Sequence, residues 1–117
     1  MRKARCLAAT VVTPGRACPE APAYSVIALH PSSVDLAVGP DAGCLDPTDE
    51  VLLINLQGTP TRVGNVGVWE TLRVKDVDGG TVDFTAAKTR FYGDIPGSDQ
   101  GIGDGGQKVA LPTQAAR

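Results

Sequence analysis

The sequence predicts an all-β fold, either a small barrel of five or six strands or a compact sandwich, with little or no helix. The chain holds 14 Gly and 9 Pro but only 4% aromatic residues, which favours many turns over long helices. Its hydrophobic residues recur with a period of two in several short segments. Short strands with one hydrophobic face bury that face and protect their edges when the sheet curls closed.

The centre of the predicted fold is Glu50–Thr85, where the hydrophobic pattern and the turn residues agree. Val51–Leu56 is a short apolar run of strand-forming residues, typical of a buried strand. Over Val68–Lys75 the side chains alternate, so one face can be dry and the other wet. Asp78–Gly80 supplies the positive φ angles of a tight hairpin, and the alternation resumes in Thr81–Thr85. These features predict a three-stranded meander.

Three further strands are expected on either side of the meander. Tyr24–Leu29 is a strand candidate that ends at His30-Pro31, because proline cannot donate to a ladder. Ser33–Val38 alternates again, and Lys108–Leu111 can return as a closing strand. The Gly, Pro and Asp content of Gly39–Asp49 predicts an irregular surface connection.

The remaining segments are expected to be loops. Gly58–Gly67 is predicted to be a mobile loop that a ligand can approach, and Ala86–Arg90 to make a helical turn that Phe91-Tyr92 anchors to the core. Gly93–Gln107 is rich in glycine and has no apolar period, so a flexible excursion is expected. With Trp69 as an exception, the side chains expected to face inward are Val34, Leu36, Val38, Val51, Leu53, Leu72, Val74, Val82, Phe84, Val109 and Leu111.

At 117 residues the chain has room for one domain. We predict a leader and linker over 1–22, a single β domain over 23–112 and a tail over 113–117. The formal charge of −2 offers no long-range attraction for nucleic acid or an anionic membrane. No run approaches the roughly 20 apolar residues that cross a bilayer, so no transmembrane helix is expected.

The amino-terminal segment admits two interpretations. A basic start followed by the apolar run Cys6–Val12 is typical of a secretory signal. Cleavage near Ala17 would remove Cys6 and leave Cys18 and Cys44 to form a disulfide, and the protein would be secreted or held at the cell surface. Alternatively the sequence is a fragment with a poorly ordered start, and without a signal the protein is cytoplasmic.

Three segments carry a resemblance to a known family, namely Asp49–Gly58 (DEVLLINLQG), Asn65–Val74 (NVGVWETLRV) and Gly79–Val82 (GGTV). Together they resemble a module found in large secreted proteins of myxobacteria and related bacteria. In those proteins the module is a small β unit before a longer repetitive region, and the proteins are regarded as adhesin-like or motility-associated. The resemblance implies an extracellular location, and it carries no catalytic residue to this chain.

The resemblance covers roughly Ser33 to Leu111 and departs from the usual pattern twice. A Gly-Asp turn is usual where this chain has Pro47-Thr48-Asp49. The longer proteins continue beyond the position of Leu111-Pro112, which raises the alternative that this chain is a piece of a larger surface protein.

Calcium is the one cofactor that the sequence suggests. Asp94, Asp99 and Asp104 recur every five residues in the glycine-rich segment, where carboxylate and carbonyl oxygens suit Ca²⁺. The spacing of an EF-hand and the tandem copies of calcium β-helix repeats are both missing. His30, the only histidine, precedes a proline and lacks a nucleophile motif, so a loop histidine is the simpler interpretation.

A partner-binding site is expected around the meander. Glu70 is on the inward face between Val68 and Leu72, so it must be paired or hydrogen-bonded, either to an arginine or to loop amides, unless it lines a ligand cleft. Trp69, the only tryptophan, either covers the barrel end or stacks on a sugar or a partner side chain. Together with Arg62 and Asn65 of the neighbouring loop, these two residues are the candidate ligand-binding set.

Three functional hypotheses follow. The first is a non-enzymatic extracellular β module, structural or adhesive, of a bacterial surface protein. The second is an intracellular SH3-like barrel that binds a peptide or protein through Trp69 and the Gly58–Gly67 loop. The third is a carbohydrate-active enzyme with two carboxylates facing a cleft. A protein or a surface glycan is the expected partner, and the oligomeric state is left open.

Overall fold

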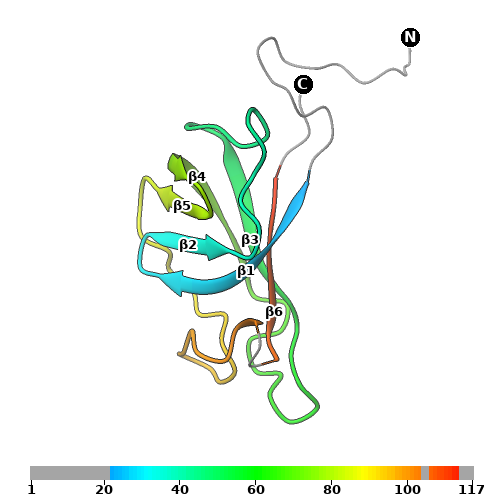
Figure 1. The fold of residues 1–117 in the computed structure, drawn as a ribbon. Helices are drawn as coiled ribbons and strands as arrows, with labels where there is room; N and C mark the ends of the chain where they lie inside the picture. The colour runs from blue at the N-terminus through cyan, green and yellow to red at the C-terminus, as the bar shows by residue number, and fades with distance from the viewer. Residues whose placement is uncertain (1–21, 104–105, 114–117) are drawn as a thin grey trace, which may run out of the picture.

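The computed structural model describes residues 22–103 and 106–113, which form an all-β domain of antiparallel strands in one sheet (Figure 1). The strands are β1 (Ala23–His30), β2 (Ser33–Leu36), β3 (Glu50–Gln57), β4 (Trp69–Asp78), β5 (Thr81–Phe84) and β6 (Lys108–Pro112). Their order is β1-β2-β5-β4-β3-β6, and β6 pairs back to β1, so the sheet closes into a barrel. The predicted all-β fold is confirmed, while the SH3-like architecture stays a prediction.

The predicted meander forms the β3-β4-β5 part of the barrel. Leu53 lies opposite Glu70 in the β3-β4 ladder, and Asp78 lies opposite Thr81 across the β4-β5 turn. Gly79 in that turn has a φ of +60°, which glycine adopts without steric cost. The described residues contain no helix of the length and apolarity that a membrane span needs.

The barrel interior is filled by alternate residues of the strands, as the period-two pattern predicts. Ten of the eleven residues expected to face inward are buried, and Val38 is the exception, with 75% of its surface exposed. Val38 was misplaced because β2 ends at Leu36, and the chain turns away after the amide of Ala37 donates to the carbonyl of Ser25 at 2.9 Å. The core also contains Val26 and Leu45, which the pattern missed. Of the pair expected to anchor its segment to the core, Tyr92 is buried and Phe91 is 46% exposed.

A β-bulge in β4 explains why strict alternation fails at its far end. The β4-β5 register shifts between Val74 and Asp76. An extra residue in one strand changes which side chains face inward. Beyond the bulge, Val77 packs against the core and Asp76 is exposed.

The segment after β5 is more ordered than its composition suggests. No helical turn forms at Ala86–Arg90, which corrects that expectation. The amides of Gly93 and Asp94 donate to the carbonyls of Ser98 and Gln100, both at 2.7 Å, so the expected loose excursion is a compact loop. At Gly93 a Cβ atom would lie 2.4 Å from the Gln100 oxygen, so only glycine fits there.

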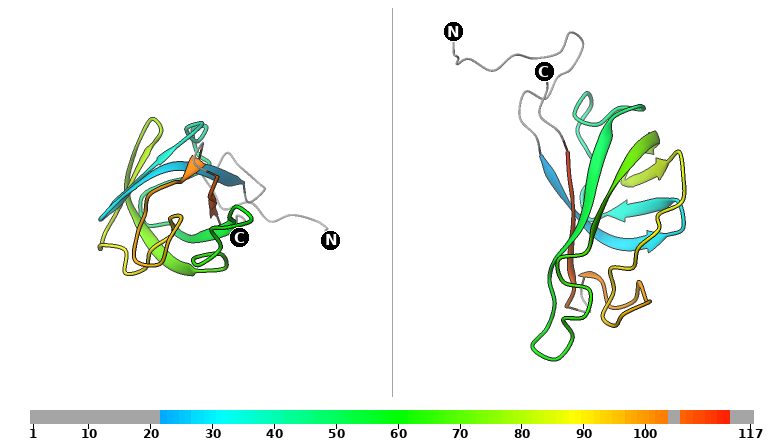
Figure 2. Two further views of the ribbon diagram at one scale, coloured as in Figure 1. Left: turned by 90° about the horizontal axis from the view of Figure 1, so that it is seen from below. Right: turned by 180° about the vertical axis from the view of Figure 1, so that it is seen from behind.

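Two loops lie at the same end of the barrel, away from the start of β1 and the end of β6 (Figures 1 and 2). One connects β3 to β4, and the other, over 85–103, follows β5. At the opposite end, the amide and hydroxyl of Thr113 donate to the carbonyl of Pro22 at 3.0 and 2.9 Å, which holds the two ends of the described domain together.

The turn before β3 contains a strained residue. Thr48 has a φ of +77°, a region that β-branched side chains rarely adopt. Its amide donates to the carbonyl of Val74 at 2.8 Å, and its carbonyl accepts from the Arg73 guanidinium at 2.7 Å. These contacts with β4 fix the strained conformation. A glycine would adopt this conformation freely.

We therefore predict that Thr48→Gly raises the free energy of unfolding by about 1 kcal/mol, because it removes the left-handed strain. Denaturant unfolding measures the change. The matched control is Thr71→Gly on the exposed face of β4, which should lower stability because glycine is unfavourable in a strand. Equal losses of unfolding free energy in Thr48→Gly and Thr71→Gly would contradict the assignment of strain to Thr48.

Candidate functional site

Glu70 fastens the loop that follows β5. Its carboxylate accepts hydrogen bonds from the Thr89 amide at 2.9 Å, the Thr89 hydroxyl at 3.2 Å, the Arg90 amide at 3.1 Å and the Tyr92 hydroxyl at 2.6 Å. The prediction that Glu70 is satisfied by loop amides is therefore confirmed. The sequence also allowed an ion pair between Glu70 and an arginine. The partners that the Glu70 carboxylate has are amides and hydroxyls.

The titration of Glu70 and Tyr92 reflects this contact. Burial acts to raise the pKa of Glu70, but the hydrogen bonds from Tyr92, Thr89 and Arg90 outweigh it and hold the pKa below the ordinary 4.5. Burial, followed by the hydrogen bond to the Glu70 carboxylate, raises the pKa of Tyr92. At neutral pH Glu70 is therefore a carboxylate and Tyr92 a neutral donor.

A pair of buried amides closes the same end of the barrel. Asn55 and Gln107 are both fully buried, and the Asn55 Nδ2 donates to the Gln107 Oε1 at 3.0 Å and to the Tyr92 carbonyl at 2.8 Å. The Gln107 Nε2 donates to the Arg62 carbonyl at 2.9 Å, and the Asn55 Oδ1 accepts from the Gln57 amide at 3.0 Å. These contacts join β3, β6 and both loops. Asn55 is not among the candidate residues predicted from the sequence, although a polar residue at an inward position of an apolar run is a detectable signal.

Lys88 and Asp99 hold the tip of the loop after β5. They form an ion pair, and only 6% of the Lys88 side chain is exposed. The Lys88 ammonium lies 4.7 Å from the centroid of the Phe91 ring and donates to the Arg90 carbonyl at 2.9 Å. The other Asp99 oxygen accepts from the Tyr92 amide at 3.0 Å. Both oxygens of Asp99 are thus engaged within the loop.

The predicted calcium ligands do not form a visible cluster. Asp99 is held by Lys88, and Asp94 lies 4.0 Å from a guanidinium nitrogen of Arg62. Asp104 lies outside the described residues. In the described part of the chain, no three side chains of the histidine, cysteine, aspartate or glutamate type gather where a metal could bind. Each of these two carboxylates thus has a cationic side chain beside it.

Asn65 has a structural position. It is buried, and its Nδ2 donates to the carbonyls of Gly93 at 3.0 Å and Ile95 at 2.7 Å. This amide therefore ties the β3-β4 loop to the loop after β5, rather than pointing to solvent as a ligand-binding group would. Arg62 lies on the surface of the same loop.

Trp69 is the most prominent of the predicted binding residues. It lies on the outer face of β4, opposite Ile54 of β3, with 56% of its surface exposed, so it does not cover the barrel end. Two shallow hollows meet at Trp69, and Arg90 lines both. One hollow also contains Val66, which is 41% exposed. The indole is thus available to a partner beside a cationic side chain.

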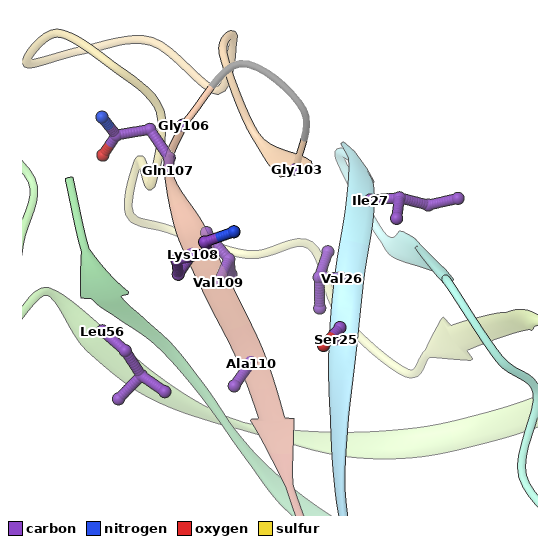
Figure 3. A pocket seen from close by; sticks show the side chains of 10 residues that line it. All are labelled: Ser25, Val26, Ile27, Leu56, Gly103, Gly106, Gln107, Lys108, Val109 and Ala110. Atoms are coloured by element: carbon purple, nitrogen blue, oxygen red, sulfur yellow. The ribbon is translucent and has the colours of Figure 1, made fainter. Parts of the chain in front are cut away.

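A deeper hollow lies where β1 and β6 separate (Figure 3). Their pairing ends at Val26 opposite Val109, and beyond it the two strands diverge. The hollow has a volume of about 400 Å³ and extends to Leu56 of β3. Lys108 brings a positive charge to its lining, while Ile27 and Leu56 are more than half exposed. No sequence signal indicated this hollow, because it depends on where two distant strands part.

The remaining candidates are a cysteine pair and the histidine. Cys44 is buried in the β2-β3 loop, whereas Cys18 lies outside the described residues, so their pairing stays a prediction. His30 Nε2 lies 2.9 Å from Asp35 Oδ2 across the β1-β2 turn, and Thr81 donates to the other oxygen at 3.0 Å. The hydrogen bond with His30 is the main reason that the pKa of Asp35 is lowered. This exposed pair connects β1, β2 and β5.

The fold and the site together define a closed antiparallel barrel of six strands, fastened at one end by buried polar side chains and exposing a tryptophan on its outer face. Comparisons with protein families, with curated proteins and with solved structures find no significant match to this chain.

The Glu70 contacts generate a prediction about acid stability. Because the pKa of Glu70 is lowered by folding, its contribution is present above the unfolded value of 4.5 and is lost as pH falls through the folded value. Stability should therefore fall below about pH 4.5. Glu70→Gln should lower stability at pH 7 by about 1–3 kcal/mol and make the acid loss shallower. Denaturant unfolding between pH 2 and pH 7, on the order of ten points, measures both effects.

The control is Asp78→Asn at the exposed end of β4, which should change stability by less than about 0.5 kcal/mol. If the free energy of unfolding of Glu70→Gln falls with pH in parallel with that of the wild type, a carboxylate other than Glu70 causes most of the acid destabilisation.

Proposed function

We propose that this domain is a non-enzymatic structural or adhesive β module of a bacterial surface protein, and that it binds a protein or a surface glycan through its outer face. The observation that carries the proposal is the contrast between two sets of side chains. The carboxylate and amides at the barrel end hold loops in place, whereas Trp69 is exposed beside two hollows. Exposed aromatic side chains are favoured at interfaces because they combine apolar area with a polar edge.

The extracellular location rests on separate support. The basic and apolar start is typical of a secretory signal, and the resemblance to secreted myxobacterial proteins covers most of the barrel. We propose that Cys18 and Cys44 form a disulfide after processing. Cys44 is buried at the base of the β2-β3 loop, so a bridge there would tie the segment before β1 to that loop. By the chain-entropy model a loop of this length contributes roughly 3 kcal/mol.

A second candidate is an intracellular SH3-like barrel that binds a peptide or protein partner. The observation that favours it is the same exposed indole, because Trp69 lies beside Val66 of the β3-β4 loop, which would complete a peptide groove. The two proposals share a binding residue and differ in where the partner resides.

The test uses the chain as bait against two fractions of a source cell, the surface proteins and the intracellular soluble proteins. Trp69→Ala should lose the specific partner because it removes the exposed indole. The matched control is Val38→Ala, which truncates a side chain that is 75% exposed on a different loop. Loss of a surface partner supports the first proposal, and loss of an intracellular partner supports the second. An unchanged partner set in Trp69→Ala, with folding verified by its denaturant midpoint, would contradict both.

A further inference from the structure

Strand β3 is apolar on both of its faces, although the barrel buries only one. Val51, Leu53 and Asn55 face the interior and are buried. The alternate residues Leu52, Ile54 and Leu56 face outward, where Leu56 is 59% exposed and the other two are partly exposed. An antiparallel strand with one solvated face normally alternates apolar and polar residues, and a near-continuous apolar run is typical of a strand that is covered on both faces. The outer side of β3 is therefore a surface that a partner would cover.

Neighbouring strands extend this surface. In the ladders, Ile54 lies opposite Trp69 of β4 and opposite Ala110 of β6, so these three side chains form a row across the sheet. Leu56 leads from this row into the hollow between β6 and β1, which Figure 3 shows with Leu56 and Ile27 on opposite sides of β6. We call this surface the β3 face. Its apolar members are Ile27, Leu52, Ile54, Leu56, Trp69 and Ala110.

The charges around the β3 face are mainly positive. Lys108 lines the hollow at one edge, and Arg90 lines both hollows beside Trp69 at the other. Among the described residues that line these hollows, the one carboxylate is Glu70, which already accepts four hydrogen bonds. On β3 itself, Glu50 shares the outward side with Leu52 and lies opposite Arg73 of β4, so these two charges offset one another. The acids Asp35 and Asp83 belong to β2 and β5, which lie across the barrel from β3 and β6. In a chain of net charge −2, this face is thus locally cationic.

We infer that the β3 face is a docking site for a polypeptide segment of another protein that carries apolar side chains flanked by carboxylates. The apolar row would cover the outer side of β3, and the carboxylates would lie against Lys108 and Arg90. Complementary charge at the rim of an apolar contact selects the partner and speeds association. This inference rests on the proposed binding function and adds the location of the site and the chemistry of the partner.

The test uses Trp69 fluorescence, because Trp69 is the only tryptophan and belongs to the β3 face. The probes are two synthetic peptides with the same Leu-Val-Ile-Val-Leu centre, one with two glutamates at each end and the other with two lysines. The glutamate peptide should shift the emission saturably and bind at least about tenfold more tightly than the lysine peptide at low salt. The double variant Arg90→Glu with Lys108→Glu should reverse that preference.

Leu56→Ser should weaken the binding of the glutamate peptide by about tenfold, because it removes exposed apolar area from the β3 face. Val38→Ser, at an exposed residue outside the face, should not change the affinity. Absence of saturable binding by either peptide, or equal affinity for both, would overturn the inference. Dimer formation through this face would also overturn the inference, because a second copy of the chain would then cover it. Light scattering would show a molar mass that doubles as the protein concentration rises and that stays at the monomer value in Leu56→Ser.

The bait experiment separates this inference from the proposed function. If Trp69→Ala loses its partner while the two peptides bind equally, the binding function stands and the assigned partner chemistry is wrong.

Discussion

The structure depends on how one end of the barrel is closed. Glu70 of β4, Asn55 of β3 and Gln107, the residue before β6, hold the loops at this end by hydrogen bonds, and Asn55 and Gln107 are fully buried. A buried polar group without a partner costs about 1–3 kcal/mol, so these side chains and the loop atoms that they contact require one another. The loops consequently behave as part of the barrel, and Tyr92 can belong to the core although it lies in no strand.

This closure also accounts for where binding can occur. Glu70 and Asn65, two of the polar side chains singled out from the sequence, are engaged at the barrel end, and the groups that they contact are mostly backbone amides and carbonyls. The outer surface of β3, β4 and β6 differs from the closed end, because it exposes apolar side chains to solvent beside Arg90 and Lys108. Under the proposed function, a partner would contact the side of the sheet, while the closed end provides rigidity.

The strands and most of the core could be predicted because side chains alternate locally, and the hairpin at Gly79 has a distinctive turn sequence. Val38 was misplaced because the end of β2 depends on a contact with β1. The closing network could not be predicted, because Asn55 and Gln107 are 52 residues apart and only the barrel brings them together. Glu70 was recognised as a residue that needs partners, but the identity of those partners depended on the path of the loop.

The central claim is that the loop after β5 is fastened to the barrel and does not open independently. Native-state hydrogen exchange followed by NMR tests it most directly, because the amides of Thr89, Arg90 and Tyr92 donate to Glu70 and Asp99. These three amides should exchange only with global unfolding, at the same free energy as the amides of β4. Exchange at the rate of an open loop, while the β4 amides remain protected, would contradict the account.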